Sequence, residues 1–139
     1  MSEEKNKQKI ILNKTPIPEQ DPKERSSNFE EVTLGYSPEM AIKEAGRCLQ
    51  CKKPLCVEGC PVHIPIPQFI KAIKEGDFKN AIDLIKTASF LPAVCGRVCP
   101  QEDQCEKNCS LGKKASRLPL AVLRGLLLIM QCSTGMEML

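Results

Sequence analysis

Eight of the nine cysteines in this chain of 139 residues fall into two short runs. The first run holds Cys48, Cys51, Cys56 and Cys60, and the second holds Cys95, Cys99, Cys105 and Cys109. In each run one cysteine is followed directly by a proline, at Cys60-Pro61 and at Cys99-Pro100. Thiols clustered in this way serve as disulfides, as zinc ligands or as ligands of iron–sulfur clusters. The compartment and the spacing decide between these chemistries.

The ends of the chain predict a cytoplasmic protein without a membrane partner. The N-terminal MSEEKNKQKIILNK is charged and lacks the apolar stretch of a secretory signal. The apolar run at residues 118–130 is interrupted by Arg124 and Gly125 and is too short to span a bilayer. In a reducing cytosol, clustered thiols are metal ligands more often than disulfides. The net charge of +3, without a stripe of basic and aromatic residues, gives no support for a nucleic-acid partner.

The spacing of the cysteines favours iron–sulfur clusters over zinc. A structural zinc site usually combines two Cys-x2-Cys pairs, and only Cys48 and Cys51 form such a pair. Bacterial ferredoxins carry tight cysteine runs that end in Cys-Pro, and the last cysteine of such a run ligates the other cluster. The alternative is a structural interaction domain without a redox role, stabilised by clusters or by a zinc ion on the first run. His63 would be a further zinc ligand in the zinc case and a loop residue that hydrogen-bonds near the cluster otherwise.

Helices are expected to position both runs. The stretch 37–50 predicts a helix, with Ser37 as its N-cap and Pro38 at its first position, and this helix would deliver Cys48 at its end. Stretches 66–76 and 77–88 have apolar residues at helical spacing. No window alternates with a period of two, so we predict a small all-α fold.

The same patterns predict which side chains are buried. The first helix is expected to bury Met40, Ile42, Ala45 and Leu49. The polar, proline-containing residues 1–36 predict an extended N-terminal arm, which we expect to be pinned to the domain by Phe29, Val32 and Leu34.

The two runs with their flanks resemble a known module. C-L-Q-C-K-K-P-L-C-V-E-G-C-P and L-P-A-V-C-G-R-V-C-P-Q-E-D-Q-C-E-K-N-C are similar to the N-terminal two-cluster domain of the NADPH-dependent glutamate synthase small subunit. The same module occurs in dihydropyrimidine dehydrogenase and in an electron-bifurcating ferredoxin:NADP oxidoreductase. P-E-Q-D-P-K-E-R and N-F-E-E-V match the preceding arm, so the resemblance covers residues 16–114.

The resemblance implies two [4Fe-4S] clusters in a small helical unit, alpha-helical ferredoxin-like, that passes electrons between FAD and a partner flavin. FAD and NADPH would be bound only by an oxidoreductase region that follows in the intact family protein, and the partner flavin by a large subunit. It assigns one cluster to Cys48, Cys51, Cys56 and Cys109, and the other to Cys60, Cys99 and Cys105. Cys95 is an open case, because its counterpart in relatives is not a ligand and a downstream Gln or Glu takes that role.

The chain departs from the family after Lys114. The expected segment, of the type I-G-R-L-E-R-F, is replaced by A-S-R-L-P-L-A-V-L-R-G-L-L-L-I-M-Q-C-S-T-G-M-E-M-L. With suitable synonymous codons for residues 118–139, a frame shifted by two bases reads S-V-G-R-L-E-R-F-V-A-D-Y, which is the missing segment. We therefore predict an extended arm at 1–36, an iron–sulfur domain at 37–114 and an out-of-frame tail at 115–139.

Several expectations follow from this tail. The chain lacks nucleotide-binding Gly-x-Gly-x-x-Gly segments, so it is not expected to catalyse a reaction alone. The second cluster would be completed by Cys95 or Cys132, or would remain incomplete. The apolar run 118–130 either packs as a substitute helix or stays exposed and favours aggregation.

Residues around the thiols carry further expectations. Three cations, Lys52, Lys53 and Arg97, are expected either to be solvated or to offset part of the cluster charge and raise the reduction potential. Gly59 and Gly96 are expected to let the backbone approach the sulfides, or else to be simple turn glycines.

Overall fold

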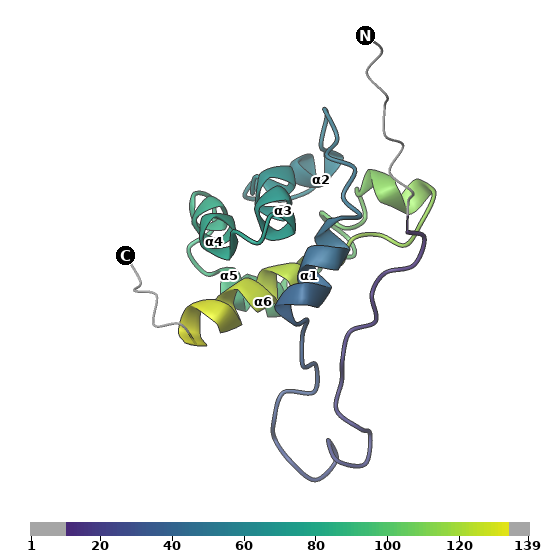
Figure 1. Ribbon diagram of the computed structural model, residues 1–139, viewed down its shortest axis with the longest axis vertical. Helices are drawn as coiled ribbons and strands as arrows, with labels where there is room; N and C mark the ends of the chain where they lie inside the picture. The colour runs from purple at the N-terminus through teal and green to yellow at the C-terminus, as the bar shows by residue number, and fades with distance from the viewer. Residues whose placement is uncertain (1–10, 134–139) are drawn as a thin grey trace.

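A computed structural model describes residues 11–133, apart from the side chains of 128, 129 and 131–133. Its helices are α1 (Pro38–Ala45), α2 (Leu55–Glu58), α3 (Ile66–Lys74), α4 (Phe78–Lys86), α5 (Pro92–Val98), the 3₁₀ helix η1 (Ser110–Lys113) and α6 (Leu120–Ser133). Within the described residues, the β-pairing consists of one isolated antiparallel bridge, between Glu19 and Thr33. The predicted all-α fold is confirmed (Figure 1).

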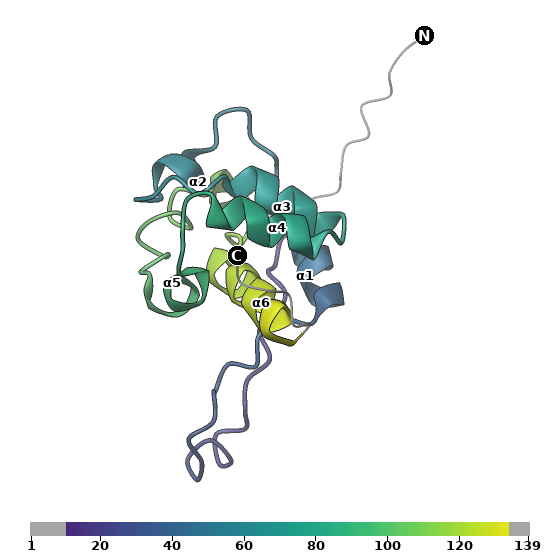
Figure 2. The ribbon, with the colours of Figure 1, turned by 90° about the vertical axis from the view of Figure 1, so that its left-hand side faces the viewer.

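Helices α3 and α4 lie side by side, α4 contacts α6, and α6 packs mainly against α5, as Figure 2 shows. Gly76 ends α3 with a φ of +78°, a left-handed conformation that glycine adopts without a steric cost. Asp77 then caps α4, because its Oδ1 accepts the backbone N–H of Asn80 at 3.1 Å. The two helices form where the sequence predicted them, at 66–76 and 77–88.

Helix α1 begins as predicted and ends earlier than predicted. The Ser37 hydroxyl accepts the N–H of Met40 at 3.3 Å, and Pro38 occupies the first helical position. The helix stops at Ala45, however, and the chain then continues as a turn and a loop towards Cys48. Leu49, expected in the core, therefore lies beyond the helix and is exposed. The buried face consists of Ala41, Glu44 and Ala45, while Met40 and Ile42 are half-buried.

Helix α6 packs into the core, so the apolar run does not stay exposed. Its buried side chains include Leu120, Leu123, Leu126 and Leu127. The Oε1 atom of Glu106 accepts the backbone N–H of Ala121 at 3.2 Å and so caps the start of the helix. Among the described residues, none of the helices has both the length and the apolar composition needed to cross a membrane.

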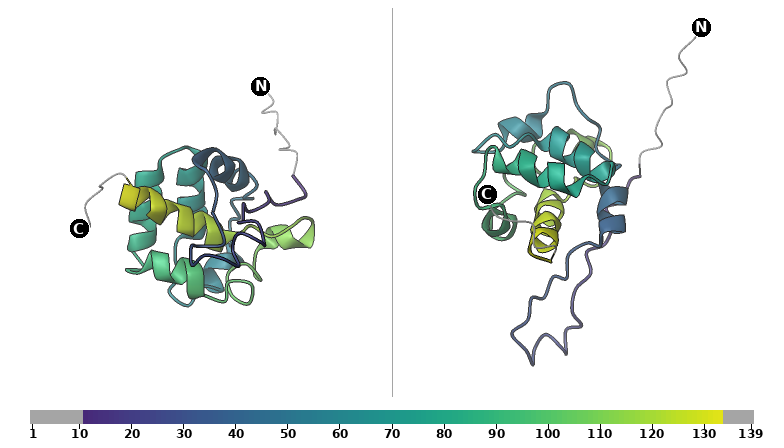
Figure 3. Two further views of the ribbon diagram at one scale, coloured as in Figure 1. Left: turned by 90° about the horizontal axis from the view of Figure 1, so that it is seen from below. Right: turned by 60° about the vertical axis from the view of Figure 1, so that its left-hand side comes forward.

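The N-terminal arm forms a long loop that projects from the helices (Figures 1 and 3). The predicted anchors were wrong, because Phe29, Val32 and Leu34 are all exposed. The buried Tyr36 holds the base of the loop instead, since its hydroxyl donates to the carbonyl oxygen of Thr15 at 2.5 Å. The difference arises because the loop turns back on itself, with the Leu34 N–H donating to the Pro18 carbonyl at 2.8 Å, and does not lie along the core.

A buried ion pair fastens the beginning of the described arm. Glu44 and Arg47 are both almost fully buried and form an ion pair with each other. The Glu44 carboxylate also accepts the N–H of Thr15 at 2.8 Å, and Arg47 Nε donates to the carbonyl of Ile11 at 3.0 Å. Arg47 further donates to the carbonyl of Ser116, so one charged pair joins the arm, α1 and the segment before α6.

Candidate metal centres

The first cavity is walled by four thiols from both cysteine runs. Cys48 and Cys51 lie in the loop between α1 and α2, and Cys56 lies in α2. Cys109 is the residue that directly precedes η1. The remaining wall is mostly apolar and is formed by Leu49, Pro54, Leu55, Pro67, Ser110, Leu111 and Leu118. The last cysteine of the second run thus faces three cysteines of the first.

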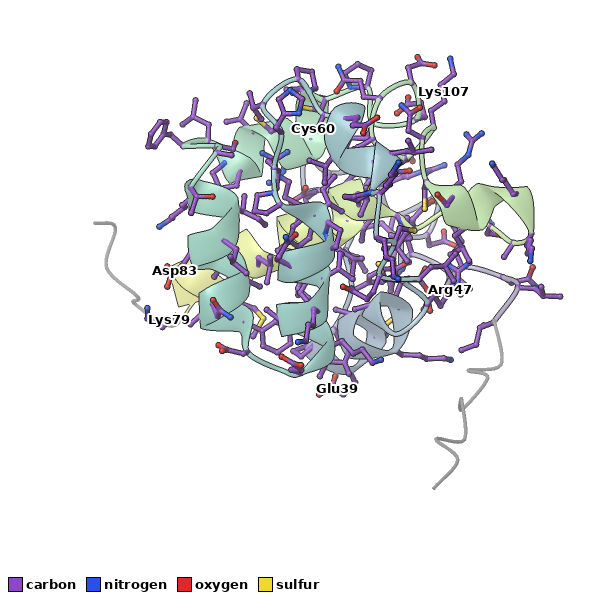
Figure 4. The ribbon with its side chains drawn as sticks, turned by 90° about the horizontal axis from the view of Figure 1, so that it is seen from above. Glu39, Arg47, Cys60, Lys79, Asp83 and Lys107 are labelled. Atoms are coloured by element: carbon purple, nitrogen blue, oxygen red, sulfur yellow. The ribbon has the colours of Figure 1, made fainter. Side chains whose placement is uncertain are left out.

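The second cavity, of about 360 Å³, combines the runs in the opposite way, with one thiol from the first run and three from the second. Cys60, the last cysteine of the first run, lies on it together with Cys95, Cys99 and Cys105 of the second run. Cys95 is part of α5, and Cys99 is its C-terminal cap. Figure 4 labels Cys60 in the segment after α2, on the side of the molecule away from Glu39 in α1. Each cavity therefore receives three thiols from one run and one from the other.

Burial disfavours the charged thiolate form of these cysteines unless a positive charge lies nearby. It raises the pKa of Cys56 to about 11 and that of Cys105 to about 12, and it raises the pKa of Cys48. Backbone N–H groups oppose this rise in all three cases, that of Gln50 at Cys48 and that of the next residue at the other two. Such N–H groups directed at sulfur are the contacts that tune thiolate-bound clusters.

Cys95 and Cys99 lie close to each other and to a buried cation. Burial raises the pKa of Cys99, the neighbouring Cys95 raises it further, and the guanidinium of Arg124 lowers it. The Cys95 sulfur is also 3.9 Å from the hydroxyl oxygen of Ser89. Cys95 thus faces the second cavity with the other three thiols, whereas the side chain of Cys132, at the end of α6, lies outside the described residues.

A family model for dihydropyrimidine dehydrogenase domain II, with its 4Fe-4S cluster, matches residues 25–128. The match includes both cysteine runs and most of α6.

The chain belongs to this 4Fe-4S family.

Proteins similar to this chain include subunits of glutamate synthase [NADPH] and of NAD-dependent dihydropyrimidine dehydrogenase. The chain is 42% identical over 95 residues to the glutamate synthase [NADPH] small chain of Halomonas elongata, covering 68% of this chain and 20% of that protein. It is 40% identical over 102 residues to the same subunit of Escherichia coli, covering 73% and 22%. It is 35% identical over 109 residues to the PreT homolog of Salmonella typhi, a subunit of NAD-dependent dihydropyrimidine dehydrogenase, covering 78% and 26%. The chain therefore spans about a fifth to a quarter of the length of these relatives.

The donor set of each cavity fits a cluster of the 4Fe-4S family. A [4Fe-4S] cluster is held by four cysteine thiolates, and each cavity presents four thiols. In the described part of the chain, no three side chains of His, Cys, Asp or Glu are grouped closely enough to hold a single metal ion. Thiolates that bind different iron atoms of one cluster stand further apart than the ligands of one ion. Family membership and donor chemistry agree on an iron–sulfur domain.

The other residues singled out in the sequence lie away from the cavities. Arg97 is exposed, and its Nε and Nη2 donate to the Glu31 carboxylate at 2.9 and 3.0 Å, so its charge is already paired with the arm. Lys52 and Lys53 are also exposed. His63 is exposed with a φ of +50°, and its backbone N–H donates to the carbonyl of Cys60 at 3.0 Å.

Two residues near the cavities were missed or misread by sequence reasoning. Arg124 lies on the second cavity, although the sequence shows it only as a break in an apolar run. Gly59 approaches protein and not a ligand, because a Cβ atom on it would lie 2.8 Å from the carbonyl oxygen of Gln104 and 2.4 Å from Nδ2 of Asn108. A helical register that aligns Arg124 with the buried leucines would have been the signal for the first residue. No local signal identifies the second.

Proposed function

We propose that this chain is the electron-transfer module of an NAD(P)H-dependent flavin oxidoreductase and holds two [4Fe-4S] clusters. The observation that carries the proposal is the pair of four-thiol cavities, each completed by a cysteine from the other run. The proposed ligands of the first cluster are Cys48, Cys51, Cys56 and Cys109. Those of the second cluster are Cys60, Cys95, Cys99 and Cys105.

A bound [4Fe-4S] cluster would accept and release single electrons. The protein supplies thiolate ligands, backbone N–H groups directed at sulfur and an apolar wall that limits access of water. These three contributions set the reduction potential of such a site. The chain itself breaks and forms no substrate bonds under this proposal.

The proposed partners are a flavin- and NAD(P)H-binding region and a second flavin subunit. Support comes from the relatives, two of which are named as small chains of NADPH-dependent glutamate synthase. We place the chain first in a glutamate synthase context and second in a dihydropyrimidine dehydrogenase context. A cytoplasmic location and the absence of catalysis by the chain alone stay predictions.

The direct test is the iron, acid-labile sulfide and zinc content of the full chain purified without oxygen. Two cubane clusters require about eight iron and eight sulfide per chain. About four of each would leave one cluster and contradict the four-thiol assignment of one cavity. Zinc without sulfide, persisting after anaerobic reconstitution, would overturn the proposal in favour of a structural interaction domain.

Electron transfer needs a second measurement on the loaded chain. NADPH alone is expected to leave the cluster absorbance unchanged, whereas NADPH with a flavin-containing oxidoreductase region of a glutamate synthase small chain is expected to bleach it. Clusters that dithionite reduces but that the flavoprotein cannot reduce would point to a structural role for the clusters.

We also infer that the gene is read out of frame after about Lys114. The support is the shifted reading S-V-G-R-L-E-R-F-V-A-D-Y, which restores the segment expected in this family. The family match extends to residue 128 and the leucines of α6 fill the core at this place in the fold, so the inference concerns the reading frame of the gene and not the packing of this chain. Resequencing across codons 112–120 tests it, and an intact frame without the family segment in the shifted frame would reject it.

A further inference from the structure

Arg124 is a buried cation without a buried anion to match it. It is only 7% exposed and projects from α6 onto the second cavity. Its Nη2 donates to the hydroxyl oxygen of Ser89 at 2.7 Å, while its Nε has no hydrogen-bond partner among the described residues. A guanidinium that is removed from water without a counter-charge is strongly unfavourable, because it loses its hydration and gains no opposite charge. We therefore expect a negative charge in the cavity beside the Arg124 guanidinium.

The protein groups around Arg124 leave only sulfur to supply that charge. The polar neighbours on the cavity, Ser89, Gln101 and Gln104, are neutral. None of the ion pairs within residues 11–133 includes Arg124. Glu106, whose Oε1 accepts the N–H of Ala121 at the start of α6, does not line this cavity and forms no ion pair with Arg124. The remaining candidates are the four thiols of the second cavity and whatever they bind.

The first cavity differs in this respect. Its lining contains no arginine or lysine in the described part of the chain. The nearest buried arginine in sequence, Arg47, already forms an ion pair with Glu44. The two sites thus have similar thiol sets and different fixed charges.

We propose that Arg124 is the counter-cation of the second cluster, with its Nε–H donating to a sulfur atom there and its charge raising that cluster's reduction potential above that of the first. This inference rests on the proposed function. Reduction adds one electron to the cluster, so a fixed positive charge stabilises the reduced form more than the oxidised form. Electrons entering the domain then come to rest on the second cluster.

The test compares the loaded wild-type chain with Arg124→Gln, Arg124→Lys and the control Arg97→Gln. Arg97 lies on α5, the helix that contains Cys95 and is capped by Cys99, but it is exposed and paired with Glu31. Each protein is reconstituted anaerobically, its iron and sulfide are counted, and its one-electron couples are titrated with dithionite and followed by electron paramagnetic resonance. Cys99→Ala identifies the couple of the second cluster by its loss.

Arg124→Gln is expected to lower only the couple of the second cluster. The reduced-to-oxidised ratio of that couple at a fixed potential should fall about tenfold, which is about 59 mV for one electron. Arg124→Lys keeps the charge and should retain most of the wild-type potential, and Arg97→Gln should match the wild type. Loss of about half of the iron in Arg124→Gln, with full iron in Arg124→Lys, would also support a counter-cation.

Other outcomes overturn the inference. Unchanged couples in a fully loaded Arg124→Gln protein would remove any electrostatic role for Arg124. Equal iron loss in the glutamine and lysine variants would mean that the packing of the Arg124 side chain matters and that its charge does not. A wild-type chain that binds no sulfide would reject the proposed function itself. The iron and sulfide counts distinguish that result from a failure of the Arg124 inference alone.

Discussion

Cys60 and Cys109 are the residues on which the assignment of ligands depends. If each run held its own cluster, Cys60→Ala would damage the same site as Cys48→Ala. Because Cys60 lies on the cavity of Cys99, Cys60→Ala should instead match Cys99→Ala, and Cys109→Ala should match Cys48→Ala. Iron counts near four and the resonance spectrum of the remaining cluster in each variant test this pairing. Identical spectra in Cys60→Ala and Cys48→Ala would reject it.

The buried phenol of Tyr36 is expected to make the folded protein less stable at high pH. Burial raises its pKa to about 12, so the folded protein binds the phenolic proton more tightly than the unfolded chain, whose value is about 10. This contribution is complete below pH 10 and is lost as the pH rises through 12. The loss amounts to at most about 3 kcal/mol.

The measurement is urea unfolding of the loaded chain between pH 8 and about 12, the range over which the phenol titrates. Tyrosinate absorbance reports this residue alone, because the chain contains one tyrosine. In Tyr36→Phe the stability should be lower at neutral pH, through loss of the bond to Thr15, and nearly independent of pH over the same range. An equally steep decline in both proteins would assign the alkaline limit to other groups.

At the scale of elements, the two cysteine runs touch at Gly59. An alanine Cβ there would meet the backbone of the segment that carries Cys105 and Cys109, so the segment must shift. We expect Gly59→Ala to cost about 1–3 kcal/mol of unfolding free energy and to lower the iron content of both sites. Unfolding by urea and iron analysis measure the two effects.

Gly96 provides the matched control for Gly59. A Cβ on Gly96 would lie 3.5 Å from the backbone nitrogen of Gly125, which is ordinary contact. Gly96→Ala should therefore leave the iron content unchanged, and the gain in helix propensity in α5 should hold or slightly raise stability. A similar loss of iron in both variants would show that glycine matters at these places for a reason other than space.

The helices that could be predicted from the sequence are those with clear caps, stops and apolar spacing. Helices α3 and α4 were predictable because caps, a glycine stop and apolar spacing all agree at Gly76 and Asp77. Helix α5 was not predicted, because Pro-Ala-Val-Cys-Gly-Arg-Val has a glycine and two β-branched residues in seven positions. The cysteines were recognisable from their spacing, whereas the roles of Arg124 and Gly59 depend on packing between distant segments.

At the scale of the molecule, the pair Glu44 and Arg47 links the arm, α1 and the segment before α6. Glu44→Met leaves Arg47 buried without its counter-charge and should cost about 3–5 kcal/mol of unfolding free energy. It should also speed proteolysis of residues 11–36, because the N–H of Thr15 loses its acceptor. Urea unfolding and the rate of limited proteolysis measure the two effects.

Two comparisons identify the cause of that loss. The double variant Glu44→Met with Arg47→Met removes both charges and should be less destabilised than Glu44→Met alone. The exposed pair of Lys79 and Asp83 on α4, labelled in Figure 4, is 2.9 Å apart, and Asp83→Asn should leave the stability nearly unchanged, because solvent screens the pair. A double variant as unstable as the single one would mean that the hydrogen bonds of Arg47 matter more than its charge.

The exchange of cysteines between the runs also sets an order of events during synthesis. Cys56 leaves the ribosome 53 residues before Cys109, which completes the first cavity. At about 5–20 residues per second, the first three thiols wait roughly 3–10 s for their fourth partner. Cluster insertion at either site is therefore a late step, and in that interval the nascent thiols are open to oxidation and to stray metal ions.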